Sequence, residues 1–219
     1  MTRTAPPGDR LVPAHLHGRL VATALLALAV LVPLSVLVAG LDGSTKLDRA
    51  VYRVPWPDRE VLEHPLEWLL AASATVLPLL MPLAVLALAV LCWHAVSRRA
   101  AVFCLLAPAA ASLATALLKP LLGRPSESGE GFMFPSGHVT VVAAVATVLA
   151  VLLLPGGALA SRSSADRTWA WGVVLAVPAV TSLGTALLGY HYLTDVVGAL
   201  LVAVAVVLAV AAALDRPAP

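Results

Sequence analysis

The sequence predicts an all-α, polytopic membrane protein with six transmembrane helices, and two observations support this prediction. Hydrophobic residues make up 60% of the 219 residues, charged residues make up 12%, and the mean hydropathy is +0.94. A soluble domain is typically about half apolar and about a quarter charged, so this chain has too little polar surface for a water-soluble globule. The apolar residues also form runs near the length of about 20 residues that a helix needs to cross a bilayer.

Six apolar runs are expected to span the membrane, in order at residues 19–40, 66–96, 100–122, 137–154, 169–189 and 192–213. The first run is too long, and begins too late, to be the apolar region of a cleavable signal peptide. The second contains Pro78 and Pro82, so a kinked or tilted helix is expected there. Residues 1–18 and 214–219 are expected to be terminal tails that precede and follow one membrane domain, 19–213.

The arginines outside the spans predict the orientation. They cluster before the first span, between spans two and three, between spans four and five, and after span six, as Arg3, Arg10, Arg19, Arg98, Arg99, Arg162, Arg167 and Arg216. With six spans, all of these positions lie on one side, which the positive-inside rule makes cytoplasmic. Both termini are then cytoplasmic, and the loops 41–65 and 120–136 face outward from the cell membrane.

Composition also argues against several other classes. A net charge of +2 is too small to indicate a nucleic-acid partner. Cys92 and Cys104 both lie inside apolar runs, so they are expected to be buried thiols, with no disulfide framework. The sequence contains no Cys/His cluster of the kind that predicts a zinc site, and no cofactor is expected. The oligomeric state cannot be read from the sequence.

Polar and ionisable residues gather at the predicted outer ends of the spans, in the segments 119–138 and 184–195. They are Lys119, Arg124, Ser136 and His138 in the first segment, and His191 and Asp195 in the second. Ionisable groups near a membrane interior are expensive and generally functional. Two distant parts of the chain are therefore expected to bring two histidines to one membrane face.

His191 and Asp195 are spaced i, i+4, which places them on one face of a helix. A carboxylate bound to one imidazole nitrogen fixes the tautomer and leaves the other nitrogen to attack or to bind a proton. The simpler alternative is an interfacial ion pair at a helix start.

The sequence Pro135-Ser136-Gly137-His138 opens the fourth span, where free backbone N–H groups can bind an anion. Gly137 permits close approach, and Ser136 can cap the helix and donate a hydrogen bond. The simpler alternatives are an ordinary N-cap here, and ordinary interfacial anchors for Lys119 and Arg124. Taken together, these residues indicate a phosphate site.

The stretches "KPLLGRP", "FPSGH" and "GYHYLTD" resemble the type 2 phosphatidic acid phosphatase (PAP2) superfamily, which also contains vanadium haloperoxidases. The resemblance spans roughly residues 119–195 and implies a PAP2/haloperoxidase-like helical bundle. It implies His191 as a nucleophile that forms a phosphohistidine, Asp195 as its orienting partner and His138 as general acid. It further implies Lys119, Ser136 and the Gly137 amide as phosphate-binding groups, without a metal.

Two family arginines are absent at their usual spacing. The pattern Lys-x6-Arg-Pro places Ser126 where arginine is expected, and Arg124, two residues earlier, is the expected substitute. The arginine six residues before His191 is replaced by Thr185, which can donate one neutral hydrogen bond to a phosphate. Both Arg124 and Thr185 are therefore expected to bind substrate.

The resemblance implies an integral-membrane lipid phosphatase that acts at the outer face on a lipid phosphate or polyprenyl (di)phosphate. Undecaprenyl-type carriers, phosphatidylglycerophosphate and phosphatidic acid are the candidate substrates. A phosphotransferase with a lipid or sugar acceptor, or a catalytically silent lipid-binding protein, remain alternatives. A transporter fits less well, because spans one and two carry no intramembrane charge. The loop 41–65 and residues 126–134 are expected to set substrate choice, with Glu127 and Glu130 facing water or pairing with Arg124.

Overall fold

The computed structural model describes residues 11–52, 65–126, 131–157, 159–160 and 164–215, and these residues confirm the all-α prediction. They form seven helices, with no strand beyond an isolated bridge between Pro125 and Phe132. The helices are α1 (Ala14–Val38), α2 (Lys46–Tyr52), α3 (Pro65–Ala95), α4 (Arg98–Leu122), α5 (Gly137–Leu153), α6 (Ser164–Leu187) and α7 (Leu193–Leu214).

Five of these helices are long and apolar enough to cross a membrane, namely α1, α3, α4, α6 and α7. The sixth predicted span corresponds to α5, which has 17 residues and is shorter than the usual spanning length. The number of six spans therefore stays a prediction, although the membrane character of the protein is clear. Helix α2 was not predicted, because its residues were assigned to an outer loop.

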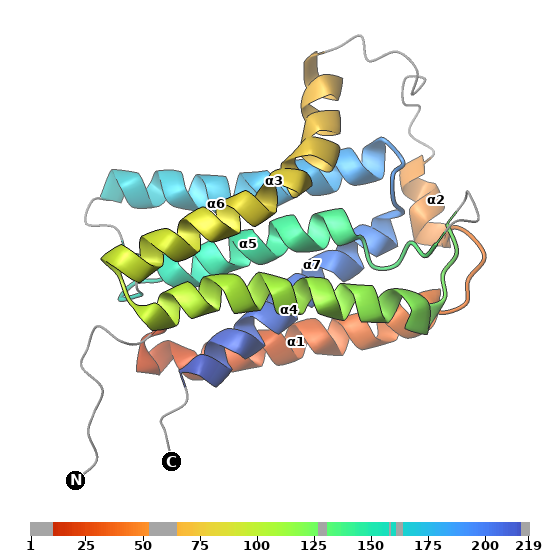
Figure 1. The fold of residues 1–219 in the computed structure, drawn as a ribbon. Helices are drawn as coiled ribbons and strands as arrows, with labels where there is room; N and C mark the ends of the chain where they lie inside the picture. Colours follow the sequence, from red (N-terminus) through yellow and green to blue (C-terminus); the bar gives the residue numbers. More distant parts are fainter. Residues whose placement is uncertain (1–10, 53–64, 127–130, 158, 161–163, 216–219) are drawn as a thin grey trace.

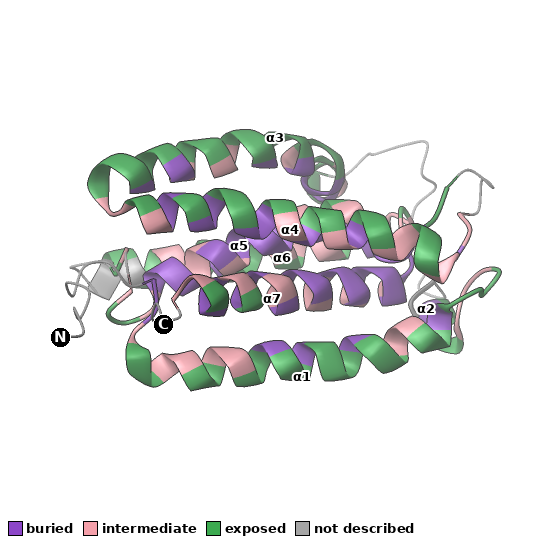
Figure 2. Ribbon diagram, turned by 60° about the horizontal axis from the view of Figure 1, so that its bottom comes forward, coloured by how far each residue is buried: buried purple, intermediate pink, exposed green. Residues whose placement is uncertain are grey.

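The long helices run roughly side by side, with α5 and α7 in the interior (Figure 1). Buried positions concentrate on α5 and α7, whereas α1 and α3 carry broad exposed faces (Figure 2). Those faces are made of large apolar side chains, such as Leu25, Leu26, Leu79 and Leu83. In water such a surface would be unfavourable, but it is the surface that lipid tails solvate.

The two ends of the bundle carry different loops. Figure 1 places the α3–α4 turn, the start of α1 and the ends of α5 and α7 at one end. Helix α2, the segment after α4 and the α6–α7 turn lie at the opposite end. All segments predicted to form the site therefore share one end, as the alternating topology requires. Which end faces the cytoplasm remains a prediction.

Helix α3 is bent, and it packs closely against α6. Helix α3 contains Pro78 and Pro82, and its first part bends away from the bundle (Figure 1). Such a bend is expected, because proline removes an intrahelical hydrogen bond and its ring clashes with the preceding turn. Gly184 of α6 lies against the Leu70 carbonyl, where a β-carbon would clash. Small residues of this kind let helices approach closely in membranes.

The largest core cluster joins α1, α3, α4, α5 and α7 and includes Phe103. Cys92 and Cys104 belong to it as free, buried thiols whose sulfur atoms lie 3.7 Å apart. The sequence-based expectation for these residues was thus correct. Their burial leaves the thiols as small hydrophobic packing groups.

Candidate active site

Three chain segments and α2 meet at one end of the bundle. Helix α4 stops at Gly123, whose φ of 62° allows the left-handed cap in which its N–H bonds to the Lys119 carbonyl. The chain then turns back, and Met133 N donates to the Arg124 carbonyl at 2.9 Å. The return segment leads directly to the start of α5.

The start of α5 is fixed to α7 by Ser136. This residue is fully buried, its hydroxyl accepts from Val139 N at 3.5 Å, and its own N–H donates to the Asp195 carbonyl at 3.1 Å. Since Thr140 N bonds to the Ser136 carbonyl, the helix itself leaves the amides of Gly137 and His138 for a ligand. A β-carbon on Gly137 would meet nothing within 4 Å, so the space beside this residue is open.

Phe134 locks the same segment against α7. Its buried ring occupies the position that a β-carbon on Gly198 would need. Only glycine at position 198 accommodates the ring there. The placement of Ser136 and Gly137 therefore depends on a close contact one turn beyond Asp195.

The α6–α7 turn positions His191. The Thr185 carbonyl accepts from Tyr190 N at 3.0 Å and from His191 N at 3.2 Å. Nδ1 of His191 lies 3.5 Å from Oδ2 of Asp195, and the imidazole is partly accessible, with 14% of its side chain exposed. A carboxylate beside Nδ1 leaves Nε2 as the nitrogen available to a reacting group.

Asp195 is fully buried at the third position of α7. Its Oδ2 accepts from Tyr192 N at 3.1 Å, and its Oδ1 accepts from Arg124 Nη1 at 2.6 Å. These bonds hold the carboxylate in a single orientation beside His191.

Lys119 and His138 complete the group of ionisable side chains. His138 is exposed at the start of α5 and interacts electrostatically with both His191 and Lys119. The half-buried Lys119 donates from Nζ to the Phe132 carbonyl at 2.5 Å and interacts electrostatically with Asp195. The structure thus brings the two histidines, the lysine and the aspartate together from α4, α5, α7 and the α6–α7 turn.

The side chain of Arg124 is held by several parts of the protein. It is fully buried, with its guanidinium over the Tyr192 ring at 4.3 Å. Nη1 donates to Thr194 Oγ1 at 2.7 Å as well as to Asp195, and Nη2 donates to the Gly43 carbonyl at 2.8 Å and to Asp48 Oδ2 at 3.0 Å. Both terminal nitrogens are therefore engaged with the protein, behind the carboxylate of Asp195.

Thr185 is likewise buried, and its hydroxyl donates to the Thr181 carbonyl of its own helix at 2.7 Å. In this arrangement the threonine contributes its backbone carbonyl to the α6–α7 turn. Its hydroxyl proton is committed to α6.

Asp48 also lies in this buried cluster, although it was not among the residues predicted for the site. Asp48 is fully buried, and its Oδ1 accepts from Thr194 N at 2.9 Å. Burial raises the pKa of Asp48, but hydrogen bonds from the Thr194 and Thr45 amides and from Arg124 outweigh it, so the pKa lies below its ordinary value. The available signal was the spacing of Thr45 and Asp48, which is that of a helix capping box.

Glu127 and Glu130 lie outside the described residues, as does the whole loop between α2 and α3. Within the described ranges, no group of three or more His, Cys, Asp or Glu side chains could hold a metal ion. Metal-independent chemistry remains a prediction.

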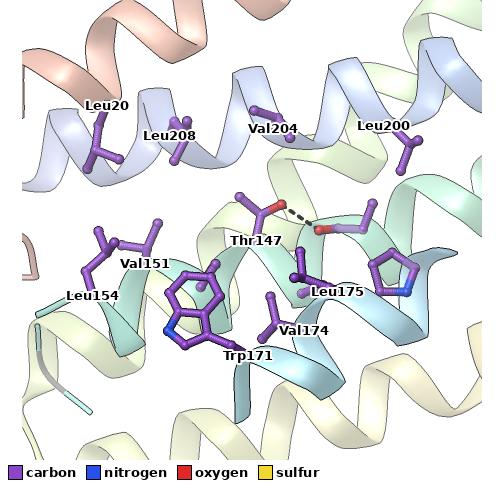
Figure 3. Close-up of a pocket in the computed structure, with 14 residues that line it drawn as sticks. Leu20, Thr147, Val151, Leu154, Trp171, Val174, Leu175, Leu200, Val204 and Leu208 are labelled. Atoms are coloured by element: carbon purple, nitrogen blue, oxygen red, sulfur yellow. Dashed lines mark hydrogen bonds between the residues drawn. The ribbon is translucent and has the colours of Figure 1, made fainter. Parts of the chain in front are cut away.

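A separate apolar cavity of about 320 Å³ lies between α5, α6 and α7, with Leu20 of α1 at its edge (Figure 3). None of its lining side chains is ionisable. The hydroxyl of Thr147, seen in Figure 3, donates to the Ala143 carbonyl at 2.7 Å. This cavity is chemically suited to hydrocarbon and not to a phosphate.

This chain is similar to a known protein family and to a solved structure. Residues 78–217, more than half of the chain, match the PAP2 superfamily, and they include Lys119, His138, His191 and Asp195. A crystal structure titled the first transmembrane PAP2 type phosphatidylglycerolphosphate phosphatase from Bacillus subtilis is similar, with a TM-score of 0.61 and 17% sequence identity. The similarity covers 86% of this chain and 94% of that one. At this identity it establishes a common fold. No match was found among curated protein sequences.

Proposed function

This chain belongs to the PAP2 superfamily, and we propose that it is an integral-membrane phosphatase acting on a lipid phosphate or polyprenyl (di)phosphate. The observation that carries the proposal is the pairing of His191 with Asp195 at 3.5 Å, at the same end of the bundle as the first amides of α5 (Figure 1). An oriented imidazole, a second histidine and a lysine beside an anion site are the groups that phosphoryl transfer through a histidine needs.

In the proposed first step, Nε2 of His191 attacks phosphorus, and the bond from phosphorus to the leaving oxygen breaks. His138 gives its proton to that oxygen, so the product leaves as a neutral alcohol or as a protonated phosphate. In the second step, water attacks the phosphohistidine while His138 takes its proton, and the N–P bond breaks to release inorganic phosphate. The exposed position of His138 at the start of α5 is compatible with both roles.

Phosphate oxygens are proposed to bind at the start of α5 and to Lys119. The amides of Gly137 and His138 would donate to them, the buried Ser136 would fix the helix start, and Lys119 would neutralise charge. For Arg124 we propose a positioning role in place of the direct phosphate contact expected from its sequence, because both terminal nitrogens bind protein acceptors. The buried Thr185 is proposed to hold the α6–α7 turn.

The position of the site at the end of an apolar bundle favours a lipid substrate. A headgroup phosphate could enter the site while its hydrocarbon tail stays beside the apolar helices. The arginine distribution favours an outward-facing site, because the opposite end carries the predicted cytoplasmic loops. Undecaprenyl-type phosphates, phosphatidylglycerophosphate and phosphatidic acid are the substrates to compare.

The test is release of inorganic phosphate by the purified, detergent-solubilised protein in the presence of EDTA. Lipid mono- and diphosphates would be compared, with His191→Ala as the inactive control. Release by the wild type that is lost in His191→Ala supports the proposal.

Absence of release from folded wild-type protein with every lipid would contradict hydrolysis. Adding alcohol or sugar acceptors to the same reactions would then distinguish a phosphotransferase from a catalytically silent lipid-binding protein. The silent alternative is favoured by one observation. The guanidinium of Arg124 and the hydroxyl of Thr185 donate to protein acceptors and not to a substrate.

A further inference from the structure

Helix α2 begins with a reciprocal pair of hydrogen bonds. Thr45 N donates to Asp48 Oδ2 at 2.8 Å, and Asp48 N donates to Thr45 Oγ1 at 3.1 Å. This is a capping box, which satisfies two N–H groups at a helix start. The side chain of Asp48 is also completely buried. A buried carboxylate needs more hydrogen bonds than the cap alone supplies, and α7 provides them.

These further hydrogen bonds come from the start of α7. Oδ1 of Asp48 accepts from Thr194 N at 2.9 Å, and Oδ2 accepts from Thr194 Oγ1 at 3.1 Å. One carboxylate thus binds the first turns of two helices. Thr194 immediately precedes Asp195, the partner of His191, so α2 is fixed to the residue next to the catalytic pair.

Arg124 provides a second connection between the two carboxylates. Nη2 bonds to Asp48 at 3.0 Å, and Nη1 bonds to Asp195 at 2.6 Å, with all three side chains fully buried. A guanidinium held at both ends by carboxylates is fixed in its plane. Without Asp48, one end of the buried guanidinium would lose its charged partner, and the group could tilt away from Asp195.

We propose that Asp48 is a positioning residue of the active site, which acts through Arg124 and Thr194 to hold Asp195 in the orientation that sets His191 for attack. The inference rests on the proposed function. Asp48 lies well before residue 78, where the match to the superfamily begins, so this chain uses a helix outside the matched region to complete its site.

The test compares Asp48→Asn with the wild type in the full-length purified protein, using the best lipid phosphate from the panel. Asparagine keeps the size of the side chain and one acceptor oxygen but removes the charge. Because misplacement of a reacting group by about 1 Å can cost about 100-fold in rate, we expect kcat to fall about 10- to 100-fold. KM is expected to stay within about threefold, because Asp48 does not touch the phosphate.

Two control variants separate positioning from folding. Thr45→Ala weakens the same capping box but retains the carboxylate, so it should lower the melting temperature while kcat stays within about threefold of the wild type. Asp42→Asn removes an exposed charge from the same segment and should change neither quantity.

A double-mutant cycle with Arg124→Met tests whether Asp48 acts on Asp195 through Arg124. If Asp48 acts through Arg124, Asp48→Asn lowers kcat less in the Arg124→Met background than in the wild type. If the two substitutions lower kcat by independent factors that multiply in the double variant, Asp48 does not act through Arg124. An unchanged kcat in Asp48→Asn, or an equal loss of kcat in Thr45→Ala, would overturn the positioning role itself.

If the wild type hydrolyses no lipid phosphate, the proposed function fails, and binding of orthovanadate decides the inference separately. Orthovanadate can adopt the five-coordinate geometry of phosphoryl transfer, and such analogues report the alignment of the attacking group. A melting-temperature increase with orthovanadate in the wild type and Thr45→Ala, reduced in Asp48→Asn, supports the inference. Equal increases in all three proteins, or none in the wild type, would overturn it.

Discussion

Nδ1 of His191 lies 3.5 Å from Oδ2 of Asp195, and the carboxylate is held from behind by Arg124 at 2.6 Å. The aspartate is thus a shared partner of an accessible imidazole and a buried guanidinium. Because Arg124 Nη1 and Tyr192 N donate to its two oxygens, the carboxylate has little freedom to turn away from His191. The predictions below follow from this arrangement and from the helix starts around it.

Asp195→Asn should abolish most activity with little change in the shape of the site. The asparagine would still occupy the start of α7, but it would lack the charge that stabilises the imidazolium and fixes its tautomer. In a comparable histidine–aspartate pair this change costs about 10⁴-fold in kcat, and we expect a loss of at least about 100-fold here. Steady-state phosphate release is the measurement, and a kcat within threefold of the wild type would rule out the role of Asp195.

His138→Ala should slow hydrolysis in a manner that depends on the leaving group. General acid catalysis typically contributes about 10²- to 10⁴-fold, so release from an alkyl lipid phosphate should fall by about that factor. An aryl phosphate whose phenol leaves without protonation should lose much less. The measurement is the rate of phosphate release from the two substrates by the wild type and the variant. Equal losses of rate for both substrates would show that His138 does not protonate the leaving oxygen.

Gly137→Ala should lower activity without lowering stability. A β-carbon at this position meets no protein atom within 4 Å, so nothing in the fold opposes it. It would project beside the amides proposed to bind phosphate and hinder their approach to the oxygens. We expect an unchanged melting temperature and a raised KM or lowered kcat. Gly18→Ala, also free of close contacts in α1, is the matched control. Full activity in Gly137→Ala would argue against phosphate binding at the start of α5.

Gly198→Ala should destabilise the protein, because its β-carbon would overlap the buried Phe134 ring. Overpacking of this kind typically costs about 1–3 kcal/mol. Gly172→Ala, at an open position in α6, should instead be neutral or stabilising by up to about 1 kcal/mol. Melting temperatures in detergent report both effects. Equal stability of the two variants would contradict the described contact between Phe134 and α7.

The charge of Asp48 should stabilise the fold in a pH-dependent manner. Its pKa is lowered in the folded protein, so its contribution is present above the unfolded value of about 3.9 and is lost as the pH falls through the folded value. The wild type should therefore exceed Asp48→Asn in melting temperature near neutral pH. The difference should shrink below about pH 4. A difference that is constant from pH 7 to pH 3 would contradict the described bonds.

The sequence predicted the long helices to within a few residues, because lipid-facing and core-facing positions alike are apolar along each span. The errors at helix starts are largest in α1 and α6, and α1, expected from residue 19, begins at Ala14. The helix continues through His15 and Arg19 because its first turns lie at the end of the bundle, where polar side chains can reach water. Similarly, α6 begins at Ser164, before the apolar run starts.

The catalytic candidates could be predicted because their chemistry depends on local spacing, as between His191 and Asp195 or within Pro135–His138. The role of Arg124 depends on which distant acceptors surround it, and sequence proximity to a phosphate motif could not reveal Asp48, 76 positions away. Asp48 itself resembled the other charges of a polar loop. The spacing of Thr45 and Asp48 indicates a helix start, but it does not indicate that α2 packs against α7 and buries Asp48, unlike the exposed Asp42.

Trapping of the covalent intermediate is the most direct test of the central claim, that His191 is the nucleophile. Protein mixed with a lipid phosphate labelled in its phosphoryl group would be quenched with alkali, under which phosphohistidine survives, and the labelled peptide would be identified. We predict one phosphoryl group on His191 in the wild type and none in His191→Ala. Turnover with labelled phosphate released, and no label on His191 at any time of quenching, would contradict the account.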